Sequence, residues 1–194
     1  MTSEKFNFTA LKFCAGLGLV YLLQIFAGFE PGFNASGSPL WKFFTSIFGH
    51  SDLQHLTNNL FFIGLFGSIY EKFTSSRMFI YTFLVSALFA NLSAFFFFQN
   101  SFLIGASGGG MGLLAALAVY RPNQIGLAMG VPIPMWAALG LYIFTNLAGL
   151  TGATNVAYEA HLLGMVTGAL IGLKLREKPY VESEESREEE DEWS

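Results

Sequence analysis

The chain has 194 residues, of which 53% are hydrophobic and only 12% are charged. Soluble domains carry roughly twice that share of charged residues, so the composition excludes an ordinary soluble domain and predicts a membrane protein. Cys14 is the sole cysteine, which excludes an intrachain disulfide. Nothing in the sequence reads as a cleavable signal peptide, and we expect no nucleic-acid partner.

The net charge of −4 is distributed unevenly along the chain. Residues 177–194 hold nine acidic and two basic side chains, and are too charged to pack into a core. We therefore expect two parts: a basic membrane domain over residues 1–176, and an acidic, disordered cytoplasmic tail over residues 177–194.

Six apolar segments are candidates for membrane spans, because a bilayer core of about 30 Å requires roughly 20 apolar residues per helix. In chain order they are Ala10–Phe29, Asp52–Tyr70, Met78–Phe98, Ala106–Tyr120, Gly126–Gly149 and Val156–Leu175. The fourth is short, which predicts a helix that begins below the membrane surface after a loop protected by protein. The predicted fold class is an all-α polytopic membrane protein with a six-helix bundle.

Local signals refine the ends of these segments. Ser51 and Gln54 have the S-x-x-Q spacing of a capping box before the second span. Pro122 is expected to end the fourth helix. Pro132 and Pro134 indicate that the first part of the fifth segment is bent or lies outside the regular helix.

Basic residues set the expected orientation, since lysine and arginine favour cytoplasmic loops. In a six-span drawing only Lys42 falls on the outer side. The side that then holds both termini carries Lys5, Lys12, Lys72, Arg77, Arg121, Lys174, Arg176 and Lys178. We therefore predict cytoplasmic termini, an outer loop from about Glu30 to Ser51, and a multi-pass protein of the cell membrane.

Strongly polar residues near the outer ends of three spans call for an explanation, because such groups are costly within a membrane. The second span begins near His50, His55, Asn58 and Asn59, the fourth near Ser107, and the sixth near His161. Taken singly, such a serine is usually a packing residue and such a histidine a hydrogen-bonding one. Their similar depth in three distant segments favours a shared site.

Ser107 and His161 are residue types that together form a serine nucleophile and its general base. No acidic third member is evident: Glu159 does not share a helix face with His161, and Asp52 lies at a helix start, where it favours the helix dipole. We therefore expect a dyad whose imidazole is oriented by packing. His55 and Asn59 share one face, and with the backbone N–H of Ser107 could donate to an oxyanion.

Glycines accompany both members of this pair. Gly105 and Gly108 flank the segment around Ser107, and the sequence after His161 places glycines at every fourth residue, namely Gly164, Gly168 and Gly172. Small residues at this spacing favour close packing of membrane helices. We expect the sixth helix to pack on the fourth, which would bring His161 within reach of Ser107.

These residues resemble the motifs of the rhomboid family of intramembrane serine proteases. The G-x-S-G motif corresponds to Gly105–Gly108, and the A-H-x-x-G motif to Ala160, His161 and Gly164. The second-span histidine and asparagine pattern is met by His50, His55 and Asn59, while Trp41–Lys42 and Glu71 are similar to two further family positions.

The resemblance covers residues 10–175 and implies six helices around a water-filled cavity open to the outside. It implies Ser107 as nucleophile, His161 as base, and an oxyanion hole of His55, Asn59 and the Ser107 backbone, with transmembrane proteins as substrates. The fifth helix and the loop near Gly149–Asn155 are implied as the substrate gate.

Two positions depart from the family pattern. Met111 stands where many members carry a tyrosine packed against the base, and Lys42 replaces the more usual arginine and so lacks its forked donor. Both departures bear on efficiency and leave the dyad intact.

Two other functions fit parts of the sequence. A non-proteolytic relative that binds membrane clients is the main alternative, and a small transporter with glycine-broken helices is the second. We expect no cofactor and no metal, since His50 and His55 are not spaced i, i+4 and lack thiolates nearby. The sequence carries no signal for an oligomeric state.

Overall fold

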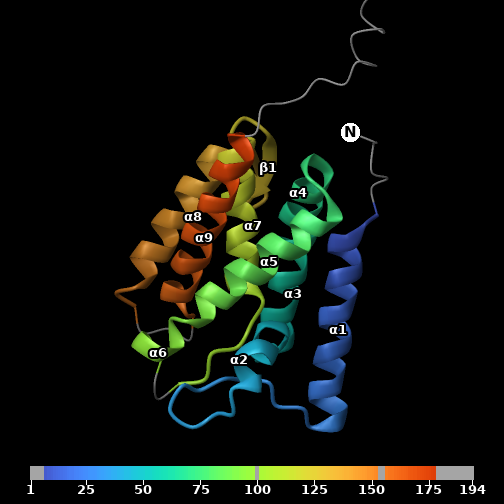
Figure 1. The fold of residues 1–194 in the computed structure, drawn as a ribbon, viewed down its shortest axis with the longest axis vertical. Coiled ribbons are helices and arrows are strands. Elements are labelled where there is room, and N and C mark those ends of the chain that lie inside the picture. Colours follow the sequence, from blue (N-terminus) through green and yellow to red (C-terminus); the bar gives the residue numbers. More distant parts are fainter. Residues whose placement is uncertain (1–6, 99–100, 153–155, 178–194) are drawn as a thin grey trace, which may run out of the picture.

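A computed structural model describes residues 7–98, 101–152 and 156–177, which are mostly helical and form one bundle (Figure 1). Two of the short helical elements are not α-helices: η1 is a 3₁₀ helix and η2 is a π-helix. The elements are α1 (Thr9–Ala27), α2 (Trp41–Thr45), η1 (Ser46–Phe48), α3 (Leu53–Phe62), η2 (Ile63–Gly67), α4 (Ser68–Phe73), α5 (Ser76–Asn91), α6 (Ala94–Phe97), α7 (Ser107–Tyr120), β1 (Ile125–Ala128), β2 (Val131–Pro134), α8 (Met135–Gly149) and α9 (Tyr158–Arg176).

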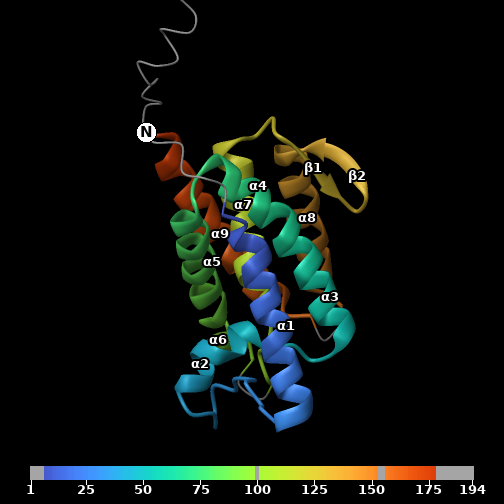
Figure 2. The ribbon, with the colours of Figure 1, turned by 90° about the vertical axis from the view of Figure 1, so that its right-hand side faces the viewer.

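Helix α7 lies in the middle of the bundle, with α5, α8 and α9 around it (Figures 1 and 2). Every residue from Gly108 to Ala118 is buried, so the helix is surrounded by protein on all sides. This fits its sequence, because a helix that is apolar or glycine-rich around its whole circumference has no polar face to present to water.

Each of the six predicted spans contains a helix, and the second is a continuous run from α3 through η2 to α4. Among the described residues, two segments are long and apolar enough to cross a membrane by length and composition, namely α1 and the segment Ser76–Phe97. Helices α7 and α8 are shorter, and α9 carries charged residues in its first and last turns.

The predicted fifth span begins too early. Residues 125–134 form an antiparallel hairpin in place of helix, so the all-α prediction has to be corrected by one two-stranded sheet. The turn residues Met129 and Gly130 both have positive φ, of 50° and 80°, as a two-residue type I′ turn requires. Helix α8 starts only after Pro134, since proline at positions 132 and 134 lacks the N–H that a helix interior needs.

The predicted cap of the second span is wrong by one residue. Asp52, which adopts an extended conformation, caps α3, and its side chain accepts a hydrogen bond from the backbone N–H of His55 at 2.8 Å. Ser51 instead donates to the Asp52 carboxylate at 2.8 Å. A carboxylate at this position satisfies a free helix N–H and also complements the helix dipole.

The start of α1 and the end of α9 lie at the same end of the bundle (Figure 1). The end of α4, the start of α5 and the end of α7 lie there too, so the helix ends that carry lysine and arginine are grouped. Helix α2, which contains Lys42, lies at the opposite end. Residues 178–194 of the acidic tail, together with Lys5, lie outside the described residues.

Glu71 joins three helices at the end of the bundle that holds the termini. Its carboxylate accepts from the backbone N–H groups of Thr9 and Ala10, each at 3.0 Å, and from the Ser76 hydroxyl at 2.8 Å. The side chain is only 4% exposed. It therefore satisfies first-turn N–H groups of α1 and holds α1 against α4 and α5.

We expect Glu71→Gln to destabilise the fold, because an amide NH₂ would face N–H donors and leave them unpaired. The free energy of unfolding should fall by about 2–3 kcal/mol, the range for a buried hydrogen-bonded charge. An unfolding titration with SDS in mixed micelles measures it. Glu30→Gln, at an exposed glutamate, is the control and should leave the midpoint unchanged.

Candidate active site

The segment before α7 enters the bundle and is held by backbone hydrogen bonds (Figure 1). Phe33 and Leu103 form an antiparallel bridge through two bonds of 3.0 and 2.8 Å, and both side chains are buried. The N–H of Gly105 donates to the carbonyl of Ser46 at 2.9 Å. Because its backbone groups are paired within the protein, this segment can deliver Ser107 to a point inside the bundle.

Gly105 allows the imidazole of His55, on α3, to lie close to Ser107. Its φ of 133° lies in the region that favours glycine. A Cβ at this position would lie 2.8 Å from Nε2 of His55 and 3.8 Å from Oγ of Ser107. Glycine is therefore required here by the backbone and by the imidazole that occupies the space of a side chain.

The glycines of α9 lie directly against the backbone of α7. A Cβ on Gly164 would collide with the carbonyl oxygen of Gly108, and one on Gly168 with that of Gly112. A Cβ on Gly172 would lie 2.6 Å from the carbonyl oxygen of Ala116. The contact follows one face of each helix over three successive turns, and only hydrogen at these positions permits it.

This contact brings Ser107 and His161 together. Nε2 of His161 lies 2.7 Å from Oγ of Ser107, and Nδ1 of His161 lies 2.8 Å from Oδ1 of Asn146 on α8. The Asn146 amide is oriented by its NH₂ group, which donates to the carbonyl of Tyr142 at 2.7 Å. Since Oδ1 can only accept, the proton lies on Nδ1 of His161, and Nε2 is free to accept from the serine hydroxyl.

Asn146 was not among the residues expected at the site, and the expectation that packing alone orients His161 is wrong. The group that orients the imidazole is the Asn146 amide, which takes the position that a carboxylate has in a serine–histidine–aspartate triad. The available signal was a strongly polar residue in the interior of an apolar segment, 4% exposed in the structure.

A second chain of hydrogen bonds fixes His55. Its Nδ1 lies 3.1 Å from Oγ of Ser51, and that hydroxyl donates to the Asp52 carboxylate. The carboxylate accepts the serine proton, so Nδ1 of His55 is the donor to Ser51. The NH₂ of Asn59, one turn along α3, donates to the backbone carbonyl of His55 at 3.0 Å, which leaves its other N–H available.

His50 is buried against this chain, with 1% of its surface exposed and its ring centroid 5.1 Å from that of His55. Gln24 of α1 holds its backbone through two hydrogen bonds of 2.9 Å. Burial, and secondly the imidazole of His55, lower the pKa of His50 to about 4, while the Phe48 carbonyl and Asp52 act weakly in the opposite direction. His50 is therefore neutral at pH 7.

We expect this burial to make the fold sensitive to acid. The pKa of His50 is below its ordinary value of 6.5, so the unfolded chain binds more protons between these values. The stabilising contribution is complete above about pH 6.5 and is lost as the pH falls towards 4. Thermal unfolding in detergent across this range should show a smaller loss for His50→Gln than for the natural chain; equal losses would contradict the assignment.

Tyr158 contacts the imidazole of His161. Its ring lies edge-on, with centroids 6.3 Å apart, and a Cβ on Gly149 would collide with the Tyr158 ring. An aromatic ring from α9 thus contacts the histidine. At the position on α7 where rhomboids often carry a tyrosine, this chain has Met111. Met111 is buried within α7. The loop expected as a gate near Gly149–Asn155 lies partly outside the described residues.

Within residues 7–98, 101–152 and 156–177, no group of three or more histidine, cysteine, aspartate or glutamate side chains could hold a metal ion. The polar groups that converge are instead the Ser107 hydroxyl, the imidazoles of His161 and His55, and the side-chain amide of Asn146.

Comparison with known proteins gives the family. A model of the Rhomboid domain matches residues 37–178, which is more than half of the chain and includes Ser107 and His161. The chain belongs to the rhomboid family. Among curated rhomboid relatives, Rhomboid-like protein 11, chloroplastic, of Arabidopsis thaliana is 34% identical over 71% of this chain and 52% of its own length.

Two further rhomboid relatives come from Toxoplasma gondii. Rhomboid-like protease 1 is 28% identical over 76% of this chain and 54% of its own length. Rhomboid-like protease 3 is 30% identical over 50% of this chain and 36% of its own length. The chain thus spans about half the length or less of the curated relatives that it matches. The Rhomboid match begins after α1, so the groups that hold α1 in place, Glu71 and Gln24, join it to the matched domain.

Proposed function

We propose that this rhomboid crosses the cell membrane six times, with both termini in the cytoplasm. The outward faces of its helices support this, because large apolar side chains are exposed there as lipid contact requires, among them Leu19, Phe26, Phe144 and Leu170. Phe26 of α1 is 83% exposed. The grouping of basic helix ends at one end of the bundle supports the orientation.

We further propose that the protein is an intramembrane serine endopeptidase that cleaves membrane proteins in or near a transmembrane segment. The observation that carries this proposal is the continuous bonding from Ser107 through His161 to Asn146, drawn from three different helices. A serine that only packed, or bonded to its own helix, would not need a neutral imidazole held in one tautomer.

In the proposed reaction, Oγ of Ser107 attacks the scissile carbonyl carbon while Nε2 of His161 takes the hydroxyl proton. Asn146 accepts the Nδ1–H bond throughout, and its amide oxygen stabilises the imidazolium that forms. His161 then gives the proton to the leaving amine as the peptide C–N bond breaks. Water hydrolyses the resulting ester of Ser107, with His161 again as the base.

The developing oxyanion needs donors. The backbone N–H of Ser107 lies in the first turn of α7 and is one of the groups without a partner inside the helix. The second N–H of the Asn59 amide is also available. His55 is the third proposed donor, and since its Nδ1 proton is committed to Ser51, Nε2 donates only when the ring carries both protons.

A fluorophosphonate probe tests the proposal directly, because it reacts with activated serines by forming an Oγ–P bond and releasing fluoride. The purified chain in mild detergent should be labelled at Ser107, as read by peptide mapping, and heating before addition should abolish labelling. Absence of labelling, with no cleavage of a panel of transmembrane substrates, would contradict the protease and favour the client-binding alternative.

We expect Asn146→Leu to slow cleavage by about 10²-fold, because removing the acceptor frees the tautomer and the ring orientation of His161. Thr145→Val is a matched control, since Thr145 also donates to the carbonyl of Tyr142 but does not contact His161. Asn146→Asp keeps an acceptor oxygen and should recover most of the rate. Loss confined to stability, with an unchanged rate per folded molecule, would contradict the positioning role.

A further inference from the structure

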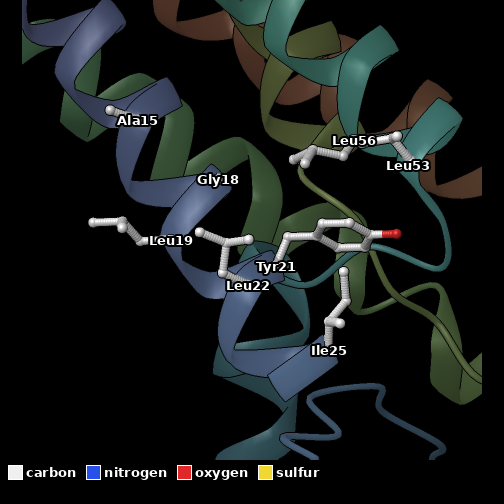
Figure 3. A pocket seen from close by; sticks show the side chains of 8 residues that line it. All are labelled: Ala15, Gly18, Leu19, Tyr21, Leu22, Ile25, Leu53 and Leu56. Carbon is white, nitrogen blue, oxygen red and sulfur yellow. The ribbon is translucent and has the colours of Figure 1, made fainter. Parts of the chain in front are cut away.

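A groove that the proposed chemistry does not use lies between α1 and α3, with a volume of about 500 Å³ (Figure 3). It is almost entirely apolar: among the described residues that line it, Tyr21 alone has a polar side-chain group, and Tyr21 extends from α1 towards α3. The residues that line it are Ala15, Gly18, Leu19, Tyr21, Leu22, Ile25, Leu53 and Leu56.

The length of this groove matches one leaflet of a bilayer. From Ala15 to Ile25 the axis of α1 rises by about 15 Å at 1.5 Å per residue. That is half of a hydrocarbon core about 30 Å thick. The groove is open at Gly18, because a Cβ built there meets no atom within 4 Å, so a larger side chain at this position would enter it.

A second cavity, of about 480 Å³, adjoins the first where both are lined by Tyr21 and Ile25. This cavity is about half polar: Phe29, Pro31, Phe102 and Ile104 line it together with Gln24, His50 and Ser51, and with two opposite charges, Glu30 and Lys42. Neither charge forms an ion pair with another described residue. An apolar groove of leaflet length therefore adjoins a cavity that presents one positive and one negative group.

We propose that the two cavities together bind one zwitterionic, amine-bearing phospholipid of the outer leaflet. An acyl chain lies in the groove along α1, the phosphate faces Lys42, and the headgroup ammonium faces Glu30. The charges of the headgroup and the cavity are complementary, and the order of apolar and polar parts is that of the lipid. The proposal rests on the membrane embedding proposed above and is independent of proteolysis.

Native mass spectrometry of the full chain, released from nanodiscs of equal parts dioleoyl phosphatidylethanolamine and dioleoyl phosphatidylglycerol, tests this site. One phosphatidylethanolamine should remain bound in preference to phosphatidylglycerol by about fivefold, the ratio for a partly exposed ion pair of about 1 kcal/mol. Glu30→Gln should abolish the preference, and Lys42→Gln should weaken retention of both lipids. Recovery of the chain in the nanodisc fraction reports membrane embedding separately.

Gly18→Leu fills the groove and should abolish retention, as should Ala15→Phe if the first variant does not fold. Gly16→Leu is the matched control on the same helix, since Gly16 also has no atom within 4 Å of a Cβ but does not line the groove. Equal retention by Gly18→Leu and Gly16→Leu would overturn the proposal. So would equal retention of both lipids by the natural chain, or a loss of substrate cleavage in Gly18→Leu with lipid retention unchanged.

Discussion

Ser107→Ala is expected to lower the rate of substrate cleavage by about 10⁴-fold or more, because the proposed covalent route begins at this hydroxyl. The substitution removes one oxygen that is hydrogen-bonded to Nε2 of His161, and it leaves the helix contacts unchanged, so the bundle should remain folded. The measurement is cleavage of a transmembrane reporter in proteoliposomes, with thermal unfolding of the same preparation.

Ser101→Ala is the control for this result. It makes the same change six residues earlier in the chain, at an exposed serine of the segment that leads into α7, and should leave the cleavage rate unchanged. A Ser107→Ala variant that is folded and still cleaves would exclude the proposed nucleophile. A loss of cleavage together with unfolding would be resolved by Ser107→Cys, which retains a nucleophile of similar size.

Among the described glycines, Gly168 is the one whose substitution by alanine is expected to destabilise the fold most. Its Cβ would collide with the backbone carbonyl of Gly112, and a backbone atom inside a central helix cannot move aside as a side chain can. The free energy of unfolding should fall by about 3 kcal/mol or more. Cleavage should fall as well, because α9 would shift away from α7 and carry His161 from Ser107.

Gly140→Ala is the control for the effect of replacing a helical glycine by alanine where no close contact exists. Gly140 lies in α8, and a Cβ there meets nothing within 4 Å, so the change should be neutral or slightly stabilising. An SDS unfolding titration of both variants gives the comparison. Equal midpoints would contradict the close contact between α7 and α9.

The sequence predicted where helices occur and that the helix of His161 packs on the helix of Ser107, because both predictions depend on local patterns. Apolar runs located a helix within each predicted span, and Gly164, Gly168 and Gly172 can be read as a stripe without any structure. Local signals were less reliable where two adjacent residues could both cap a helix, since Asp52, and not Ser51, caps α3. The prolines were read correctly as a departure from helix, but their hairpin was not foreseen.

Only the tertiary structure decided what surrounds the imidazole. Nothing in the spacing of Asn146 relates it to His161, since the two lie on different helices and meet only because both pack beside α7. The same holds for Tyr158 against Gly149, for Gln24 against His50, and for the groove between α1 and α3. The sequence by itself determined the positions of the apolar helices and placed Ser107 and His161 near the starts of two of them. The packing of those helices, in backbone contact where glycine allows it, decided which polar groups orient the imidazole of His161.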